Sequence, residues 1–234
     1  MNLPIILISG QLLTREFWAP LEARLGERKI IYADNQSDDT IAGMASRLLD
    51  NAPPRFHLVT HAMGGFVAFE VMRRAPERVA SLTLLATLAT ADGPAQLARR
   101  QGYVDLVESG AFDQVVEERL PMLMAPDRRE GEVADIARRM AADTGADAFL
   151  RQQRAIIARI DSRPGLAAIG VPTLLLRGDQ DGIVGAAQIE EIAAGIPHAT
   201  AMTLPGAGHL LLLEEPVIVG RLIEDHIAAS EAAT

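Results

Sequence analysis

The segment from Phe56 to Arg74 constrains the fold more than any other part of the chain. It begins with the apolar run Phe56–Thr60, passes through a turn of small residues and continues as a helical pattern. The turn contains Gly64 and Gly65, where the absence of a side chain lets strand and helix backbones pass close together. A buried strand that turns sharply into a helix is typical of a parallel sheet covered by helices.

The same alternation of apolar runs and helical patterns extends through most of the chain. Six runs are predicted to be strands: Ile5–Ser9, Lys29–Ala33, Phe56–Thr60, Ser81–Ala86, Thr173–Arg177 and Thr200–Leu204. Four helical patterns lie between or after them: Thr40–Asp50, Met63–Arg74, Gly185–Gly195 and Pro216–Ala229. We therefore expect an α/β fold with a mostly parallel central sheet and helices on both of its faces.

Residues 90–168 interrupt this alternation. They carry four helical patterns and no convincing strand: Gln96–Glu108, Phe112–Leu120, Arg129–Asp143 and Ala146–Ile160. A single crossover between two strands needs far fewer residues. We expect residues 1–89 and 169–234 to form one core, and residues 90–168 to fold over the top of the sheet as a helical lid. The arginine pairs at 99–100, 128–129 and 138–139 are predicted to lie on solvated helix faces.

The turn after Thr60 has the layout of a nucleophile elbow, whose pattern is G-x-S-x-G. Thr60 stands at the first glycine, Gly64 at the second, and Ala62 stands where the serine would be. A methyl group cannot attack a carbonyl carbon, so covalent catalysis is not open to the chain as it stands. Taken alone, the motif also fits an ordinary loop between a strand and a helix.

Two later loops supply the residue types that would serve such a nucleophile. Asp179 and Asp181 follow one predicted strand, and His209 follows the last one. The carboxyl ends of parallel strands share one edge of a sheet, where α/β proteins place their sites. A histidine can take the proton of a serine hydroxyl, and a carboxylate orients that histidine. We favour Asp181 over Asp179 for this carboxylate; either aspartate also fits a turn.

Backbone N–H groups could stabilise an oxyanion at the same place. One would come from Met63, directly after the nucleophile position. The other would come from Gln11, after the first predicted strand, with Leu12 as an alternative. The predicted wall of the pocket is apolar and suits a small to medium acyl or alcohol group; its members are Leu12, Met122, Met124 and Leu210.

With these motifs in place, the chain resembles the α/β-hydrolase family over essentially its whole length. The matching pieces are Ser9-Gly10 with a later Trp18, the run 60–65, Pro76–Val79, the run 178–181, and Gly208-His209 followed by Glu214 and Pro216. The resemblance is to small single-lid serine esterases and lactonases, which implies no metal and no organic cofactor. The chain departs from the family pattern at three positions: Ala62 replaces the serine, Ser9 replaces the usual histidine before the glycine, and Gly185 stands near where many relatives have proline after the acid loop, a minor difference.

Two explanations of Ala62 remain open. In the first, the chain is an ester or lactone hydrolase whose catalytic serine has been replaced, as in an engineered inactive variant. In the second, it is a natural non-hydrolytic member of the family. It would then be a ligand-binding receptor, or an enzyme in which Asp181 and His209 act alone as a general base, in lyase or cofactor-free oxygenase chemistry.

The composition of the chain excludes several classes of binding partner. The 234 residues include no cysteine, which excludes disulfides and thiolate metal sites, and no pair of histidines has metal-ligand spacing. A net charge of −9 argues against nucleic acid and anionic membrane surfaces as partners. The first residues do not read as a signal peptide, and no run approaches the roughly 18 apolar residues that span a bilayer. We expect a cytoplasmic protein that acts on a small-molecule ester or lactone.

Overall fold

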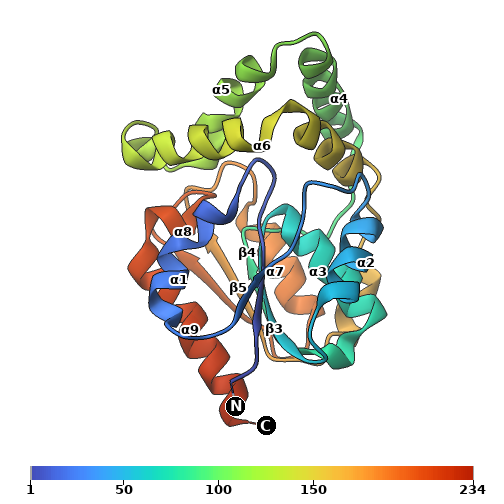
Figure 1. Ribbon diagram of the computed structural model, residues 1–234, viewed down its shortest axis with the longest axis vertical. Coiled ribbons are helices and arrows are strands. Elements are labelled where there is room, and N and C mark those ends of the chain that lie inside the picture. The colour runs from blue at the N-terminus through green and yellow to red at the C-terminus, as the bar shows by residue number, and fades with distance from the viewer. Residues whose placement is uncertain (1, 234) are drawn as a thin grey trace.

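The computed structural model describes residues 2–233 and contains a six-stranded sheet in which every neighbouring pair of strands is parallel (Figure 1). The strand order is β2-β1-β3-β4-β5-β6. The strands are β1 (Ile5–Ile8), β2 (Ile30–Tyr32), β3 (Phe56–His61), β4 (Val79–Leu85), β5 (Thr173–Gly178) and β6 (Thr200–Leu204). The predicted α/β fold is thus confirmed, with strand ends within two residues of those expected.

Helices cover both faces of the sheet (Figure 1). One layer holds α1 (Ala19–Leu25), α8 (Leu211–Glu214) and α9 (Pro216–Ala232); the other holds α2 (Ile41–Asn51), α3 (Met63–Arg74) and α7 (Ala186–Gly195). Side chains along β1 alternate between the two layers, as strand geometry requires. Ile5 and Leu7 pack with α1 and α9, whereas Ile6 and Ile8 pack with α2 and α3.

The segment between β4 and β5 is helical and lies above the sheet in Figure 1. It consists of α4 (Pro94–Glu108), α5 (Phe112–Leu123) and α6 (Glu132–Ile157). The last two helices expected here form the single span α6, which changes direction at Gly145, where φ is 74°. Glycine adopts this left-handed conformation at little cost, so the two predicted helices meet without an intervening loop.

Short helices complete the chain. The 3₁₀ helices are η1 (Arg15–Trp18), η2 (Pro76–Arg78), η3 (Pro126–Arg128) and η4 (Arg163–Ala168). The sequence analysis did not predict η1, α1 or α8, because none of them is long enough to show two clear turns of apolar periodicity. Within residues 2–233, no helix combines the length and the apolar character that a bilayer crossing demands.

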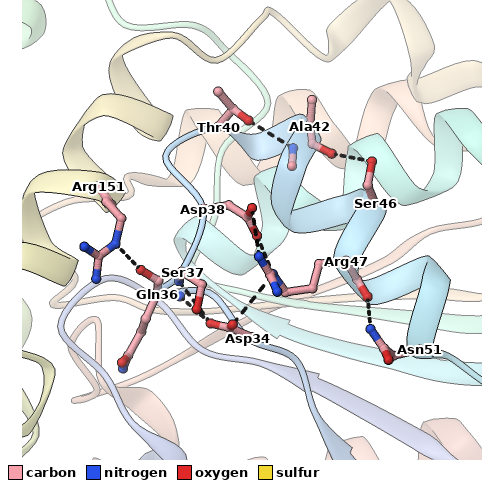
Figure 2. Close-up of polar contacts among 11 residues, drawn as sticks. Asp34, Gln36, Ser37, Asp38, Thr40, Ala42, Ser46, Arg47, Asn51 and Arg151 are labelled. Atoms are coloured by element: carbon pink, nitrogen blue, oxygen red, sulfur yellow. Dashed lines mark hydrogen bonds and ion pairs between the residues drawn. The ribbon is translucent and has the colours of Figure 1, made fainter.

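Hydrogen bonds join α6 to the loop between β2 and α2. Arg151 donates from Nε to the carbonyl of Gln36 at 2.6 Å, a contact drawn in Figure 2. The adjacent Gln152 donates from Nε2 to the carbonyl of Asn35 at 3.1 Å. Further along the chain, Thr40 caps the first turn of α2 (Figure 2). The helical segment is therefore anchored to the core beside the carboxyl edge of the sheet.

Candidate active site

A tight turn at Ala62 joins β3 to α3. Ala62 has a φ of 47° and a ψ of −109°, a region that residues with a side chain avoid. The turn is held from the β4 side: the N–H of Ala62 donates to the carbonyl of Leu85 at 2.9 Å, and the Thr87 hydroxyl donates to the carbonyl of Ala62 at 2.8 Å. The end of β4 and the residues after it thus maintain a strained conformation at Ala62, the position where the elbow pattern has its nucleophile.

Gly64 and Gly65 allow α3 to start directly against the sheet. A Cβ at Gly64 would lie 2.5 Å from the carbonyl oxygen of Ile8, and one at Gly65 would collide with the Thr87 hydroxyl. Real side chains do not approach backbone this closely, so larger residues would displace α3. The two glycines therefore fix the turn, as their place in the sequence indicated.

Asp181 and His209 meet at the same edge of the sheet. Asp181 follows β5, His209 follows β6, and the Nδ1 of His209 lies 2.9 Å from the Oδ2 of Asp181. The other oxygen of Asp181 accepts from the N–H groups of Ile183 and Val184. Burial opposes ionisation of Asp181, but the attraction of His209 and these hydrogen bonds outweigh it, so the pKa of Asp181 is lowered.

Asp179, the competing acid, has another partner. Its Oδ1 accepts from the N–H of Gly206 at 2.8 Å and so ties the end of β5 to the loop that carries His209. A carboxylate used in this way orders the loop without contacting the imidazole. The geometry therefore favours Asp181 as the partner of His209.

His61 makes a hydrogen bond to the backbone of His209. Its Nε2 lies 2.9 Å from the carbonyl oxygen of His209, and the two rings are 4.8 Å apart in an edge arrangement. Burial and repulsion from His209 lower the pKa of His61 to about 3, so the ring is neutral. A neutral His61 that donates from Nε2 fixes the backbone of the catalytic candidate, and the ring itself is not among the candidate reacting groups.

Glu214 holds the same loop from the α8 side. Its buried carboxylate accepts from the N–H groups of Gly208 and Ala125, both at 2.9 Å. Burial raises the pKa of Glu214 above its ordinary value, despite these two hydrogen bonds. A single side chain therefore connects the histidine loop to the chain just after α5.

The loop after β1 lies opposite the elbow. Ser9 accepts from the indole N–H of Trp18 at 2.9 Å and donates to the carbonyl of Thr14, so it braces the loop where the family usually has a histidine. The N–H of Leu12 donates to Gln152 at 3.2 Å and is therefore occupied. Within residues 2–233, no partner is found for the N–H of Gln11 or of Met63, the two proposed oxyanion donors.

These groups surround a cavity of about 70 Å³. Its wall includes Ala62, Met63, His209, Gln11, Leu13, Phe66, Leu123, Ile156, Val184 and Leu210. Asp181 stands behind His209 and does not line it. Most of the wall is apolar.

The predicted wall needs correction in three of its four members. Leu210 lines the cavity, but Leu12, Met122 and Met124 do not. Leu12 and Met124 are turned into the core, with exposed fractions of 4% and 1%, and the backbone of Met122 lies against Gly182. The helical face of α5 presents Leu123 instead, one residue away from both predicted methionines.

Two arginines in the wall were not foreseen. Arg100 was predicted to lie on a solvated helix face, yet it lines the cavity together with Arg119. Arg119 is 9% exposed, and its Nη1 donates to Oε1 of Gln11 at 2.5 Å. The only sequence signal was their place in predicted helices, which does not reveal which helical face meets the sheet.

Among the described residues, no group of three acids or histidines is arranged to hold a metal ion.

Comparison with known proteins agrees with this architecture. The chain matches the family model of the alpha/beta hydrolase fold over residues 34–216, and it belongs to that family. A sheet of this order with an elbow after β3 and an acid–histidine pair after β5 and β6 defines a member of the α/β-hydrolase class.

The proteins to which this chain is similar include some that are named as hydrolases or esterases. The chain is 30% identical to "Putative carbamate hydrolase RutD" of Variovorax paradoxus (strain S110), over 97% of this chain and 92% of that protein. It is similar to the solved structure of a thermophilic esterase from Thermogutta terrifontis with malate bound, at a TM-score of 0.87 and 27% identity, over 98% of this chain and 91% of that one. It shares the fold of the enol-lactonase from Burkholderia xenovorans LB400, at a TM-score of 0.87 and 22% identity, over 97% and 92% of the two chains.

Proposed function

We propose that this chain is a carboxylic ester or lactone hydrolase of the Ser-His-Asp type in which Ala62 occupies the position of the serine. One observation carries the proposal: the 2.9 Å contact between Asp181 and His209, at the edge of a cavity that Ala62 also lines. An acid–histidine pair facing an elbow has the arrangement that activates a hydroxyl nucleophile. The esterase and lactonase neighbours support the same class of reaction.

With a serine at position 62, the chemistry follows from the geometry. Asp181 holds His209 through Nδ1, which leaves Nε2 to take the proton of the hydroxyl as its oxygen attacks the ester carbonyl. The N–H groups of Gln11 and Met63 would stabilise the oxyanion. His209 then returns the proton to the leaving alcohol, and a water activated by the same nitrogen releases the acid. Residues 90–168 would act as the lid over this cavity.

With Ala62, the same site binds substrate without forming an acyl-enzyme. Removal of the nucleophile leaves the cavity, the oxyanion donors and the acid–histidine pair in place. The remaining rate enhancement then comes from binding and oxyanion stabilisation alone, which is a small part of the total. We therefore expect the present chain to be a ligand-binding protein with residual turnover.

A second candidate function rests on the intact acid–histidine pair. A histidine held by a carboxylate can abstract a proton from a substrate with no nucleophile present. In that case the chain would perform elimination or cofactor-free oxygenation, and Ala62 would simply shape the cavity. A serine at position 62 would then add nothing to the natural reaction.

Covalent labelling separates these candidates. The Ala62→Ser variant is treated with a fluorophosphonate, which reacts only with an activated serine, and the mass of the protein is measured. We expect a single adduct at position 62 that disappears in Ala62→Ser with His209→Ala. An unlabelled Ala62→Ser protein with an intact fold would contradict the hydrolase proposal and would favour the general-base reaction.

A further inference from the structure

Arg119 is a buried cation without a counter-ion. Arg119 lines the cavity, and the residue is 9% exposed. Its neighbours are the amide oxygen of Gln11 and the ring faces of Tyr103 and Phe149, each with its centroid 5.6 Å from the guanidinium carbon. In the part of the chain that the structure describes, no carboxylate lies within ion-pair distance of it. A buried charge normally has an opposite charge beside it, because removal from water is costly.

The surroundings of Arg119 add positive charge. Arg100, also in the cavity wall, shares the carboxylate of Asp92 with Arg159. Arg100 and Arg159 therefore share one carboxylate and Arg119 has none, so the three guanidinium groups carry an excess of two positive charges in a chain whose net charge is −9. Burial and repulsion from Arg100 lower the pKa of Arg119 to about 10, which still leaves it charged at neutral pH.

Two buried amide groups beside these arginines also lack acceptors. The Nε2 of Gln11 and the Nε2 of Gln153 are buried, and neither has a hydrogen-bond partner among residues 2–233. Their oxygens are occupied by arginines: Gln11 accepts from Arg119, and Gln153 accepts from Arg100 at 3.3 Å. Buried donors without acceptors are rare in folded proteins. Gln11 stands in the cavity wall, so a group bound there would need only a small shift of its amide to accept from it.

A purely structural role does not explain this arrangement. Contacts with Tyr103 and Phe149 stabilise a cation, but they satisfy none of its N–H donors. Of the five donors that a guanidinium carries, one has an acceptor here. The planar fork of an arginine matches the two oxygens of a carboxylate, which would supply both the missing charge and the missing acceptors.

We propose that Arg119, with Gln11 and Arg100, binds a carboxylate of the substrate, so that the natural ligand is a short ester or lactone that carries a free carboxylate. Arg119 and His209 line the same cavity of about 70 Å³, so a short skeleton is enough to place a carboxylate at Arg119 and an ester bond near His209. The identity of the reacting bond rests on the proposed function, whereas the carboxylate site does not. The site also changes the sequence-based expectation of a purely apolar acyl or alcohol group.

The first test measures binding to the chain as it stands, for which only residual turnover is expected. Calorimetry compares monomethyl succinate with methyl levulinate, and monomethyl glutarate with methyl 5-oxohexanoate; each pair differs by a carboxylate in place of a methyl ketone. We expect the carboxylate of each pair to bind at least about tenfold more tightly, because it makes charge-assisted hydrogen bonds. Equal affinities, or no binding of any of the four ligands at millimolar concentration, would overturn the proposal.

Variants assign the effect to Arg119. Arg119→Met keeps the bulk of the side chain and removes its charge, so the preference for the carboxylate should fall by about tenfold to a hundredfold. Arg119→Lys should recover part of it, since the charge returns without the fork. Arg99→Met, on the exposed face of the same helix as Arg100, is the matched control and should bind like the parent. An unchanged preference in Arg119→Met would contradict the assignment; if that variant does not fold, an unchanged preference in Arg119→Lys would do the same.

Turnover separates this inference from the proposed function. In the Ala62→Ser background, hydrolysis of the same four esters is measured. Selective hydrolysis of the carboxylate esters supports both proposals. Selective binding without hydrolysis supports the carboxylate site and contradicts the hydrolase. Hydrolysis without any preference contradicts the carboxylate site and leaves the hydrolase standing.

Discussion

Replacement of Asp92 by asparagine should destabilise this protein far more than an ordinary loss of an ion pair. Asp92 has a side chain that is 2% exposed, and it accepts from Arg100 at 2.5 Å and from Arg159 at 2.7 Å. Arg159 also donates to the carbonyl of Thr90. The carboxylate therefore joins α4 and the end of α6 to the loop after β4, and both of its partners are cations.

The size of the effect follows from burial. Removal of one partner from a buried pair leaves an uncompensated charge and costs about 3–5 kcal/mol. The exposed pair between Asp38 and Arg47, drawn in Figure 2, has the same 2.7 Å separation, but the arginine side chain is 45% exposed. Asp38→Asn should therefore cost about 0–1 kcal/mol. In urea, Asp92→Asn should lower the unfolding midpoint by about 1 M or more, since slopes are about 1–3 kcal/mol per M.

The pH dependence has a defined sign. Burial opposes ionisation of Asp92, but its arginine partners outweigh burial and lower its pKa. Its stabilising effect is therefore present above the ordinary pKa of 3.8 and is lost as the pH falls through the lower folded value. Asp92→Asn should lack this acid-dependent loss, and adding Arg100→Met should recover part of the stability. Equal midpoints for Asp92→Asn and Asp38→Asn would refute the reasoning.

Three further predictions concern the elbow, the histidine loop and the chain ends. Gly65→Ala should cost about 1–3 kcal/mol, because its Cβ would collide with Thr87; a thermal melt measures this, and an unchanged melting temperature would contradict it. Burial raises the pKa of Glu214, so ionisation of this carboxyl lowers the free energy of unfolding as the pH rises above 4.5. Glu214→Gln should remove this pH-dependent loss of stability, which urea titrations at several pH values would measure. The hydrogen bonds from Arg28 outweigh burial and lower the pKa of Glu231 to about 2. Glu231→Gln should therefore lower the free energy of unfolding by about 0.5–1 kcal/mol at pH 7, and by progressively less below pH 4.5.

The sequence was sufficient for the sheet and for the residues at its carboxyl edge. Buried parallel strands appear as short apolar runs, so all six were predicted in place. Asp181 and His209 are 28 residues apart, but both follow strands, and parallel strands bring such loops together. The tight turn at Ala62 could be predicted because Gly64 and Gly65 stand where α3 passes close to the sheet.

The wall of the cavity was much less predictable. It depends on how α5 and α6 rotate against the core, and a rotation by one residue exchanges Leu123 for Met122 or Met124. Periodicity shows that a helix has an apolar face, but it does not show that Arg119 lies on the buried side. The tertiary contact between Arg119 and Gln11 joins residues 108 positions apart and has no local signature.

The rate of ester hydrolysis by Ala62→Ser, relative to the present chain, tests the central claim most directly. Assays with p-nitrophenyl acetate and butyrate should show turnover that rises by about 10³-fold or more, since loss of the nucleophile in a triad costs at least that much. Addition of His209→Ala should abolish the gain. An Ala62→Ser protein that folds like the parent and remains as inactive with these esters and with the carboxylate esters would contradict the assignment of the site as a serine hydrolase.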